Sequence, residues 1–152
     1  MYLTPRFYLV LIAVAAVMAA GYAWAPLLTV GQALLCLLVL AVVAETAALY
    51  GWRAISAMRT CPERLSNGDD NEIDIRVEST YPFGTRLTII DELPFVFQRR
   101  DVAFALHLGA RSGATVTYSL RPVQRGVYGF GHIRVFATTA ISLVQRRYTC
   151  GA

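Results

Sequence analysis

Two long uncharged segments near the start of the chain limit what the rest of it can fold into. Residues 7–24 and 30–44 contain no Asp, Glu, Lys or Arg, and only a few residues separate them. At a rise of about 1.5 Å per residue, each helix would cross most or all of a hydrocarbon core of roughly 30 Å. The sequence therefore predicts a membrane helical hairpin of two transmembrane helices over residues 1–58, with residues 53–59 as a short polar extension of the second helix.

Aromatic and basic residues give this hairpin an orientation. Amphipathic rings settle at headgroup level, and rings gather at both ends of the hairpin, at Phe7, Tyr8, Tyr50 and Trp52 and at Tyr22 and Trp24. The arginines nearest to the hairpin all lie on its terminal side, and they are Arg6, Arg53 and Arg59. The positive-inside rule then places both termini and the following domain in the cytoplasm. A cleaved signal peptide is the competing interpretation of the first segment, but a second apolar segment follows it at once.

Glu45 is the ionisable residue inside the second predicted span. Intramembrane carboxylates are candidates for function by default, and a small transport-complex subunit would need this one. An anchoring or helix-pairing role is the alternative, because Glu45 lies close enough to the helix end to reach the interface or to pair with Arg53. Small residues such as Ala15 and Ala19 allow close helix packing, within the hairpin or in a homo-oligomer.

Residues 59–152 have the pattern of an all-β domain. Apolar and polar residues alternate in short runs that are separated by turn signals, as in half-buried strands. The expected strands are residues 61–65, 72–78, 85–90, 102–108, 114–121, 130–137 and 143–149. Ile73, Ile75 and Val77 face inward in the second of them, and Leu87 and Ile89 in the third. About seven short strands without a helical period predict an immunoglobulin-like β-sandwich.

The cysteines do not decide whether the sandwich domain lies in an oxidising or a reducing compartment. Cys61 and Cys150 lie near the two ends of the sandwich domain, and a disulfide between them would require an oxidising compartment. Buried free thiols are the alternative, and the cytoplasmic orientation favours them.

No catalytic or cofactor-binding pattern occurs in the sequence. His107 and His132 fall on outward faces of different strands and do not make a metal site, and residues 69–72 lack the ligand spacing of a calcium loop. Gly126, Gly129 and Gly131 are spaced wrongly for a dinucleotide fingerprint. The net charge of +4 is spread among acidic residues, unlike the basic stripe of a nucleic-acid binder. We therefore expect no enzyme activity, no cofactor, no metal and no nucleic-acid partner.

Several motifs resemble one bacterial family. Residues 62–72 read Pro-Glu-Arg-Leu-Ser-Asn-Gly-Asp-Asp-Asn-Glu, and residues 91–94 read Asp-Glu-Leu-Pro. After Arg121 and Pro122, residues 125–131 form an Arg-Gly-x-Tyr-x-Phe-Gly run, the most specific part. Together with Tyr81-Pro82 and the apolar hairpin, these motifs resemble the N-terminal part of the domain-of-unknown-function 58 proteins, which are membrane proteins encoded beside MoxR-type AAA+ ATPases. Family members often carry Pro-Leu-Gly-Leu where residues 140–143 read Ala-Ile-Ser-Leu.

The resemblance implies a location and partners. It implies the bacterial cytoplasmic (inner) membrane, with lipid around the hairpin and an AAA+ ATPase or an associated von Willebrand A-like protein as partner. Family members continue into a von Willebrand A-like domain, so we expect this chain to be a shortened member without that domain's metal site. A membrane-anchored binding or scaffold module is the leading hypothesis, and a periplasmic or cell-surface adhesion module is the alternative.

The motif residues also have a structural interpretation. Gly68 and Gly126 supply turn conformations that a β-carbon would resist. Tyr128 and Phe130 fill one end of the sandwich, next to Gly131. Arg121 or Arg125 pairs with Asp91 or Glu92, whose side chains point to opposite faces if they lie in a strand.

Overall fold

The computed structural model describes residues 1–51, 54–62, 64–94, 97, 102–124 and 126–151. The chain divides into two compact units. The helical unit comprises Met1–Trp52 with Thr138–Arg146, and the β unit comprises Arg53–Ala137 with Arg147–Ala152.

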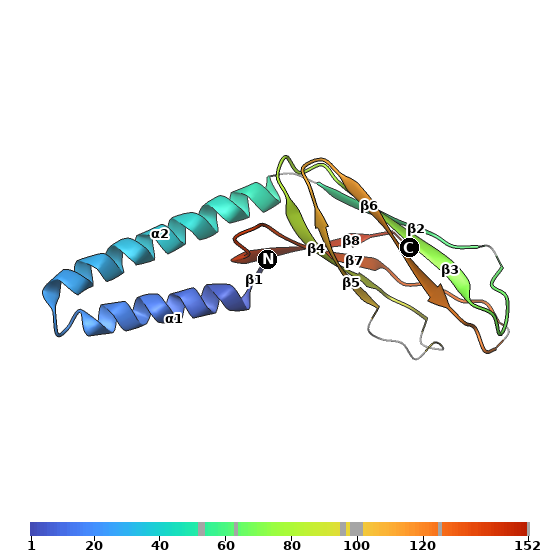
Figure 1. The fold of residues 1–152 in the computed structure, drawn as a ribbon, viewed down its shortest axis with the longest axis horizontal. Helices are drawn as coiled ribbons and strands as arrows, with labels where there is room; N and C mark the ends of the chain where they lie inside the picture. Colours follow the sequence, from blue (N-terminus) through green and yellow to red (C-terminus); the bar gives the residue numbers. More distant parts are fainter. Residues whose placement is uncertain (52–53, 63, 95–96, 98–101, 125, 152) are drawn as a thin grey trace. The chain divides into compact units, whose positions relative to one another are not determined.

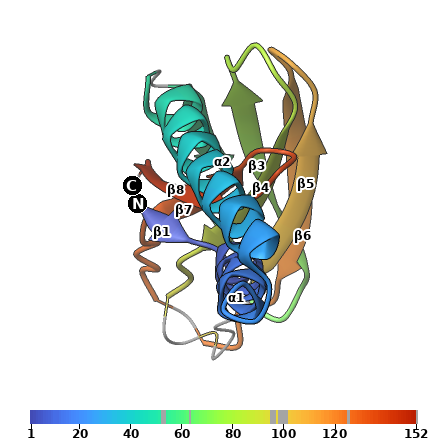
Figure 2. The same cartoon turned by 90° about the vertical axis from the view of Figure 1, so that its left-hand side faces the viewer.

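Two helices make up most of the helical unit. Helix α1 spans Pro5–Ala20 and helix α2 spans Ala25–Tyr50, each with a proline in its first turn, where the missing N–H costs nothing. Figures 1 and 2 show α1 lying alongside α2. The reversal between them needs Gly21, because a β-carbon there would lie 2.7 Å from the backbone nitrogen of Leu28.

One helix, not two, is long enough to cross a membrane among the described residues. Helix α2 has 26 residues and qualifies by length and composition, whereas α1 has 16 residues. At about 1.5 Å per residue, α1 extends roughly 24 Å and falls short of the roughly 30 Å core. The prediction of two transmembrane helices is wrong because the apolar run of residues 7–24 contains the turn as well as the helix, and apolarity alone does not distinguish them.

The segment after α2 is a strand and not a helical extension. Strand β2 spans Ile55–Thr60, with Ile55 and Ala57 buried and Ser56 and Met58 exposed. Its side chains therefore follow the period of two that places alternate residues on one face. The prediction of helix is wrong over the described residues 54–59, and Arg53 lies outside the described residues. The prediction of a strand over residues 61–65 is wrong for those of them that the structure describes, because β2 ends before Cys61.

Two antiparallel sheets form a β-sandwich in the β unit. One sheet has the order β2-β3-β6, and the other has β8-β7-β4-β5, with β1 beside β8 in the helical unit. The remaining strands are β1 Tyr2–Leu3, β3 Asn71–Ser79, β4 Thr85–Asp91, β5 Ala103–Leu108, β6 Gly113–Leu120, β7 Ile133–Thr138 and β8 Val144–Cys150. The predicted β-sandwich is thus confirmed.

The core of the sandwich follows the alternation in the sequence. Ile73, Ile75 and Val77 of β3 are completely buried, as is Ile89 of β4. These side chains lie on the inward face, while the residues between them are less buried. A one-residue slip would expose the whole set, so the pattern fixes the register, for example Ile75 opposite Val116.

The turn between β7 and β8 belongs to the helical unit. Strand β1 pairs with the start of β8, placing Tyr2 opposite Gln145 and Leu3 opposite Val144. The backbone N–H of Thr4 donates to the Leu143 carbonyl at 3.0 Å. The first residues of the chain are therefore tied to a segment that lies far along the sequence.

Candidate functional site

Two connections meet at one end of the β unit. Thr60, the last residue of β2, and Leu120, the last residue of β6, both lie opposite the first residues of β3. The connections that follow them, residues 61–69 and 122–130, therefore start at the same end of the sheet, on the two sides of β3. A hydrogen bond of 2.8 Å from the Gly68 N–H to the Pro122 carbonyl joins them.

Asn71 fixes the first of these connections. Its side chain is 8% exposed, and its Oδ1 accepts the Ser66 N–H at 2.7 Å. Its Nδ2 donates to the carbonyls of Ser66, Asp69 and Leu120 at 3.0, 2.9 and 3.3 Å. The predicted turn at residues 66–69 is confirmed, and Gly68 has the expected positive φ of 85°. Asn71 holds this turn through contacts that local sequence patterns do not reveal.

Most of the described residues of 61–69 and 122–130, but not Gly68, Val123 or Gly129, line an open depression of about 1190 Å³, which we name the end groove. Its lining combines the charged Arg64 and Asp69 with the aromatic Tyr128 and Phe130. Val127, also in the lining, is fully exposed. The ring of Tyr128 packs against Phe97 with 5.0 Å between ring centroids. Exposed apolar and aromatic side chains beside charges are typical of a protein-binding surface.

A buried ion pair supports the groove. Arg59 and Asp91 have side chains that are 8% and 0% exposed, and their contact is bidentate, with Arg59 Nε 3.1 Å from Asp91 Oδ2. The Arg59 guanidinium also donates to the Gly131 carbonyl at 3.0 Å and lies 4.8 Å from the ring centroid of Phe130. Charge-assisted bidentate pairs are the strongest of the protein hydrogen bonds. Through the contact with Phe130, this pair is joined to the lining of the groove.

Tyr118 completes this buried network. Its hydroxyl donates to Asp91, and its ring packs against Phe104 at 5.7 Å. Burial, followed by the hydrogen bond to the Asp91 carboxylate and by its charge, raises the pKa of Tyr118 well above its usual value. The tyrosine therefore stays protonated as a donor at physiological pH.

The predicted partners of Asp91 and Glu92 are corrected by the structure. Asp91 pairs with Arg59, and Glu92 pairs with Arg134, whereas Arg121 is exposed and pairs with neither. Arg125, the other predicted partner, lies outside the described residues. Asp91 is buried and Glu92 is only half-buried, in keeping with the predicted opposite directions.

The two motif glycines of the second connection differ in role. Gly131 allows a close approach, because a β-carbon there would lie 2.7 Å from the Glu92 β-carbon. Gly126 lines the end groove but lacks the predicted positive φ, and a β-carbon there would meet nothing within 4 Å. Tyr128 and Phe130 both lie at this end of the sandwich, half-buried, as predicted.

The cysteines and histidines do not form a redox or metal site among the described residues. Cys61 and Cys150 are free, so the structure contains no disulfide between them. The alternative prediction of buried free thiols is wrong for Cys61, which is exposed. His107 and His132 are exposed, as predicted, and His132 Nδ1 lies 3.1 Å from the Gly151 carbonyl. No group of three metal-ligating side chains occurs in the described part of the chain.

Cys61 is expected to react with a thiol reagent at least about tenfold faster than Cys150. Burial raises the pKa of the Cys150 thiol, so a smaller fraction is the reactive thiolate, and its side chain is half-buried. Single-cysteine variants labelled with a maleimide near pH 7 measure the two rates. Equal rates, or an oxidised pair in the purified chain, would contradict this environment for Cys150.

Glu45 lies in a second network, within the helical unit. It is 4% exposed and does not reach outward to an interface. Its carboxylate accepts the Thr139 hydroxyl and the backbone N–H groups of Leu143 and Val144, at 3.0 and 3.2 Å for the two amides. Thr139 and Leu143 lie in the β7–β8 turn, in which Ser142 has a positive φ of 58°, and Val144 is the first residue of β8. The predicted alternative partner, Arg53, lies outside the described residues.

Neighbouring contacts close the same turn. Thr4 donates its hydroxyl to the carbonyls of Ser142 and Leu143. Arg146 donates to the Leu49 carbonyl at the end of α2, and its guanidinium lies 4.6 Å from the Tyr50 ring centroid. A cation at a helix C-terminus is favourably placed for the carbonyls that lack intrahelical partners. Together with Glu45, these contacts form what we call the turn clamp.

Comparisons with known proteins give no family assignment. No protein-family model matches the sequence, and no curated protein matches it. Among solved structures, the CARDB domain of the PF1109 protein from Pyrococcus furiosus aligns with a TM-score of 0.42 at 13% identity, covering 63% of this chain and 91% of that one. A PapD-like domain of human CEP192 aligns with a TM-score of 0.43 at 12% identity, covering 64% and 83%. At these values neither likeness bears on function.

Proposed function

We propose that this chain is a non-enzymatic, membrane-anchored binding module whose end groove takes a protein partner. The observation that carries the proposal is the convergence of two motif segments on one groove. Described residues from 62–69 and from 122–130, two segments that the family resemblance singles out, line the same depression, and the Gly68 N–H joins the segments. Loops held at the end of a rigid sandwich are frequent places for recognition.

The chemistry of the groove favours binding over catalysis. A nucleophilic cysteine acts together with a neighbouring general base, most often a histidine. The described lining brings Cys61 together with Arg64 and Asp69 but contains no histidine. We propose that the sandwich is immunoglobulin-like, with β2–β8 as its seven strands, and that it serves as a rigid support for the groove.

The membrane anchor in this proposal is α2. Only 11% of its apolar window is buried, whereas a core helix of a soluble domain is mostly buried. The residues that follow it include Arg59 and Arg64, and arginines close to a span favour the cytoplasmic side. The sandwich would then lie at the cytoplasmic face of a bacterial inner membrane. There, as the family resemblance implies, a MoxR-type AAA+ ATPase is the proposed partner.

Val127→Asp is expected to weaken binding of a purified MoxR-type ATPase from the same organism by about tenfold or more. The substitution places a charge on the fully exposed apolar residue of the groove, at a cost of about 1.4 kcal/mol or more. The measurement is the dissociation constant of the full chain in nanodiscs. Val123→Asp is the matched control, because Val123 is 73% exposed and does not line the groove.

Absence of binding by the unmodified chain would contradict the proposed partner. Equal losses of affinity for the two valine variants would contradict the groove as the binding surface but would not contradict the proposed partner. Recovery of the chain in the aqueous phase without detergent would contradict the anchor.

A further inference from the structure

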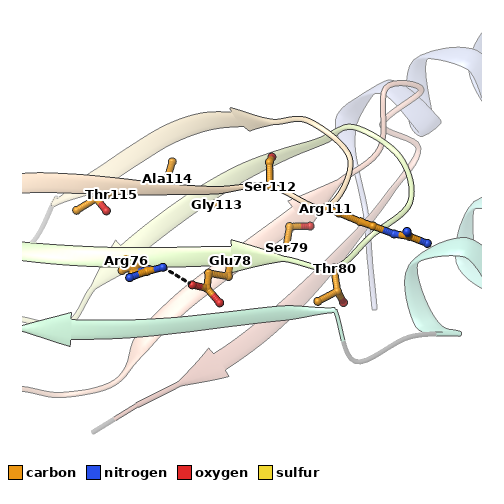
Figure 3. Close-up of a pocket in the computed structure, with 9 residues that line it drawn as sticks. All are labelled: Arg76, Glu78, Ser79, Thr80, Arg111, Ser112, Gly113, Ala114 and Thr115. Carbon is orange, nitrogen blue, oxygen red and sulfur yellow. Dashed lines mark ion pairs between the residues drawn. The ribbon is translucent and has the colours of Figure 1, made fainter.

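A second depression of about 630 Å³ lies along the paired ends of β3 and β6 (Figure 3). Its charged lining residues are Arg76, Glu78 and Arg111, and its hydroxyl-bearing lining residues are Ser79, which is buried, Thr80, Ser112 and Thr115. Guanidinium groups and hydroxyls are donors suited to phosphate oxygens. The lining therefore favours an anionic ligand.

Both arginines are available to such a ligand. Arg76 lies 2.9 Å from Glu78, but the two side chains are 71% and 54% exposed, and exposed pairs contribute little. A phosphate can therefore replace Glu78 as the partner of Arg76. Arg111 has a positive φ of 48° and donates its N–H to the Tyr81 carbonyl at 2.8 Å. Figure 3 shows its side chain extending away from the two strands.

The chain connection limits how far this depression can lie from the end of α2. The Thr80 N–H donates to the Ala54 carbonyl at 2.8 Å, and Ala54 is four residues after Tyr50, the last residue of α2. Four residues reach at most about 14 Å, whatever path they take. If α2 crosses the bilayer, as proposed above, this end of the sandwich remains within reach of the headgroup layer.

We propose that this depression binds the phosphate groups of anionic lipids, and we name it the headgroup pocket. Arg111, which has no ion pair among the described residues, supplies one cation. Arg76 exchanges Glu78 for the lipid phosphate, and the exposed Thr115 hydroxyl adds a donor. The inference rests on the proposed membrane anchor. It adds a second point of attachment, which would hold the sandwich against an anionic bilayer and leave the end groove, at the opposite ends of these strands, open to a partner.

Energy transfer between the β5–β6 connection and labelled lipid headgroups tests the proposal. The full chain, with its three cysteines replaced by serine and a donor dye at Ala110→Cys, is placed in nanodiscs of phosphatidylcholine alone or with about 30% phosphatidylglycerol. We expect stronger transfer with phosphatidylglycerol and loss of the difference near 1 M salt, where the Debye length falls to about 3 Å. Arg111→Gln and Arg76→Gln should each lower the ratio of docked to undocked protein about fivefold, as expected for one arginine at an anionic surface.

Val123→Asp is the control for the change in charge, because it alters the net charge by the same amount at the other end of the sandwich. It should leave the energy transfer unchanged. If the chain enters the nanodiscs but energy transfer is equal in both lipid mixtures, the headgroup pocket is overturned and the anchor is not. The same holds if neither arginine variant changes the energy transfer. Failure of the chain to enter the nanodiscs would overturn the anchor and, with it, this inference.

Discussion

Asp91→Ala is expected to lower the free energy of unfolding of the β-sandwich by about 3–5 kcal/mol, the range for breaking a buried ion pair by removing one partner. The variant leaves the Arg59 guanidinium, 8% exposed, without its carboxylate. It also leaves the Tyr118 hydroxyl without the acceptor that it has in the structure. Both groups then carry a desolvation cost that nothing offsets. Urea unfolding of the full chain in detergent, monitored by far-ultraviolet circular dichroism, measures the change.

Glu92→Ala is the matched control because it removes the adjacent carboxylate. Glu92 pairs with Arg134, and the two side chains are 34% and 46% exposed, so the loss should stay below about 1 kcal/mol. Replacing the whole network by Arg59→Met, Asp91→Leu and Tyr118→Phe should recover much of the stability lost in Asp91→Ala. Equal losses for Asp91→Ala and Glu92→Ala would contradict the burial of this pair.

The same network should affect the end groove. Arg59 contacts Phe130, the last residue of the second groove connection, and the carbonyl of the next residue, Gly131. A variant that loosens Arg59 should therefore weaken partner binding even under conditions where the sandwich remains folded. The groove depends on buried polar contacts as well as on its exposed rim.

Local alternation made the sandwich predictable, and small residues concealed one strand. In β3, large apolar side chains occupy every second position, so the period of two is plain from Ile73 to Val77. In β2, alanine takes a buried position at Ala57, directly after an apolar helix. The alternation there is weak, and residues 53–59 were expected to continue the helix. That error hid Arg59, whose position in a strand is what brings it to Asp91.

The contacts of the turn clamp are beyond sequence patterns for a different reason. Glu45 accepts hydrogen bonds from residues 94, 98 and 99 positions later in the chain. Propensity and periodicity act over a few residues, so they locate Glu45 in an apolar helix but do not identify its donors. The resemblance did mark this turn, because residues 140–143 depart there from the usual family sequence.

Glu45→Ala is expected to lower the free energy of unfolding of the helical unit by about 3–5 kcal/mol, because buried donors that lose a charged acceptor cost about 1–3 kcal/mol each. The donors are the Leu143 and Val144 amides and the Thr139 hydroxyl. Hydrogen exchange of the full chain in detergent measures the effect at the amides of the β7–β8 turn. Gln32→Ala, an exposed polar residue of the same helix, is the control and should change little.

Glu45→Gln separates a structural role from an ionic one. The glutamine oxygen can still accept the Leu143 and Val144 amides, and its amino group can donate to the Thr139 oxygen once that hydroxyl rotates. The substitution should therefore cost only about 1–2 kcal/mol, the difference between charged and neutral hydrogen bonds at this site. A transport role would require the ionisable group and would be abolished by glutamine with the fold intact. Loss of turn protection in Glu45→Gln as large as in Glu45→Ala would contradict the clamp, because it would show that charge, and not acceptor geometry, holds the turn.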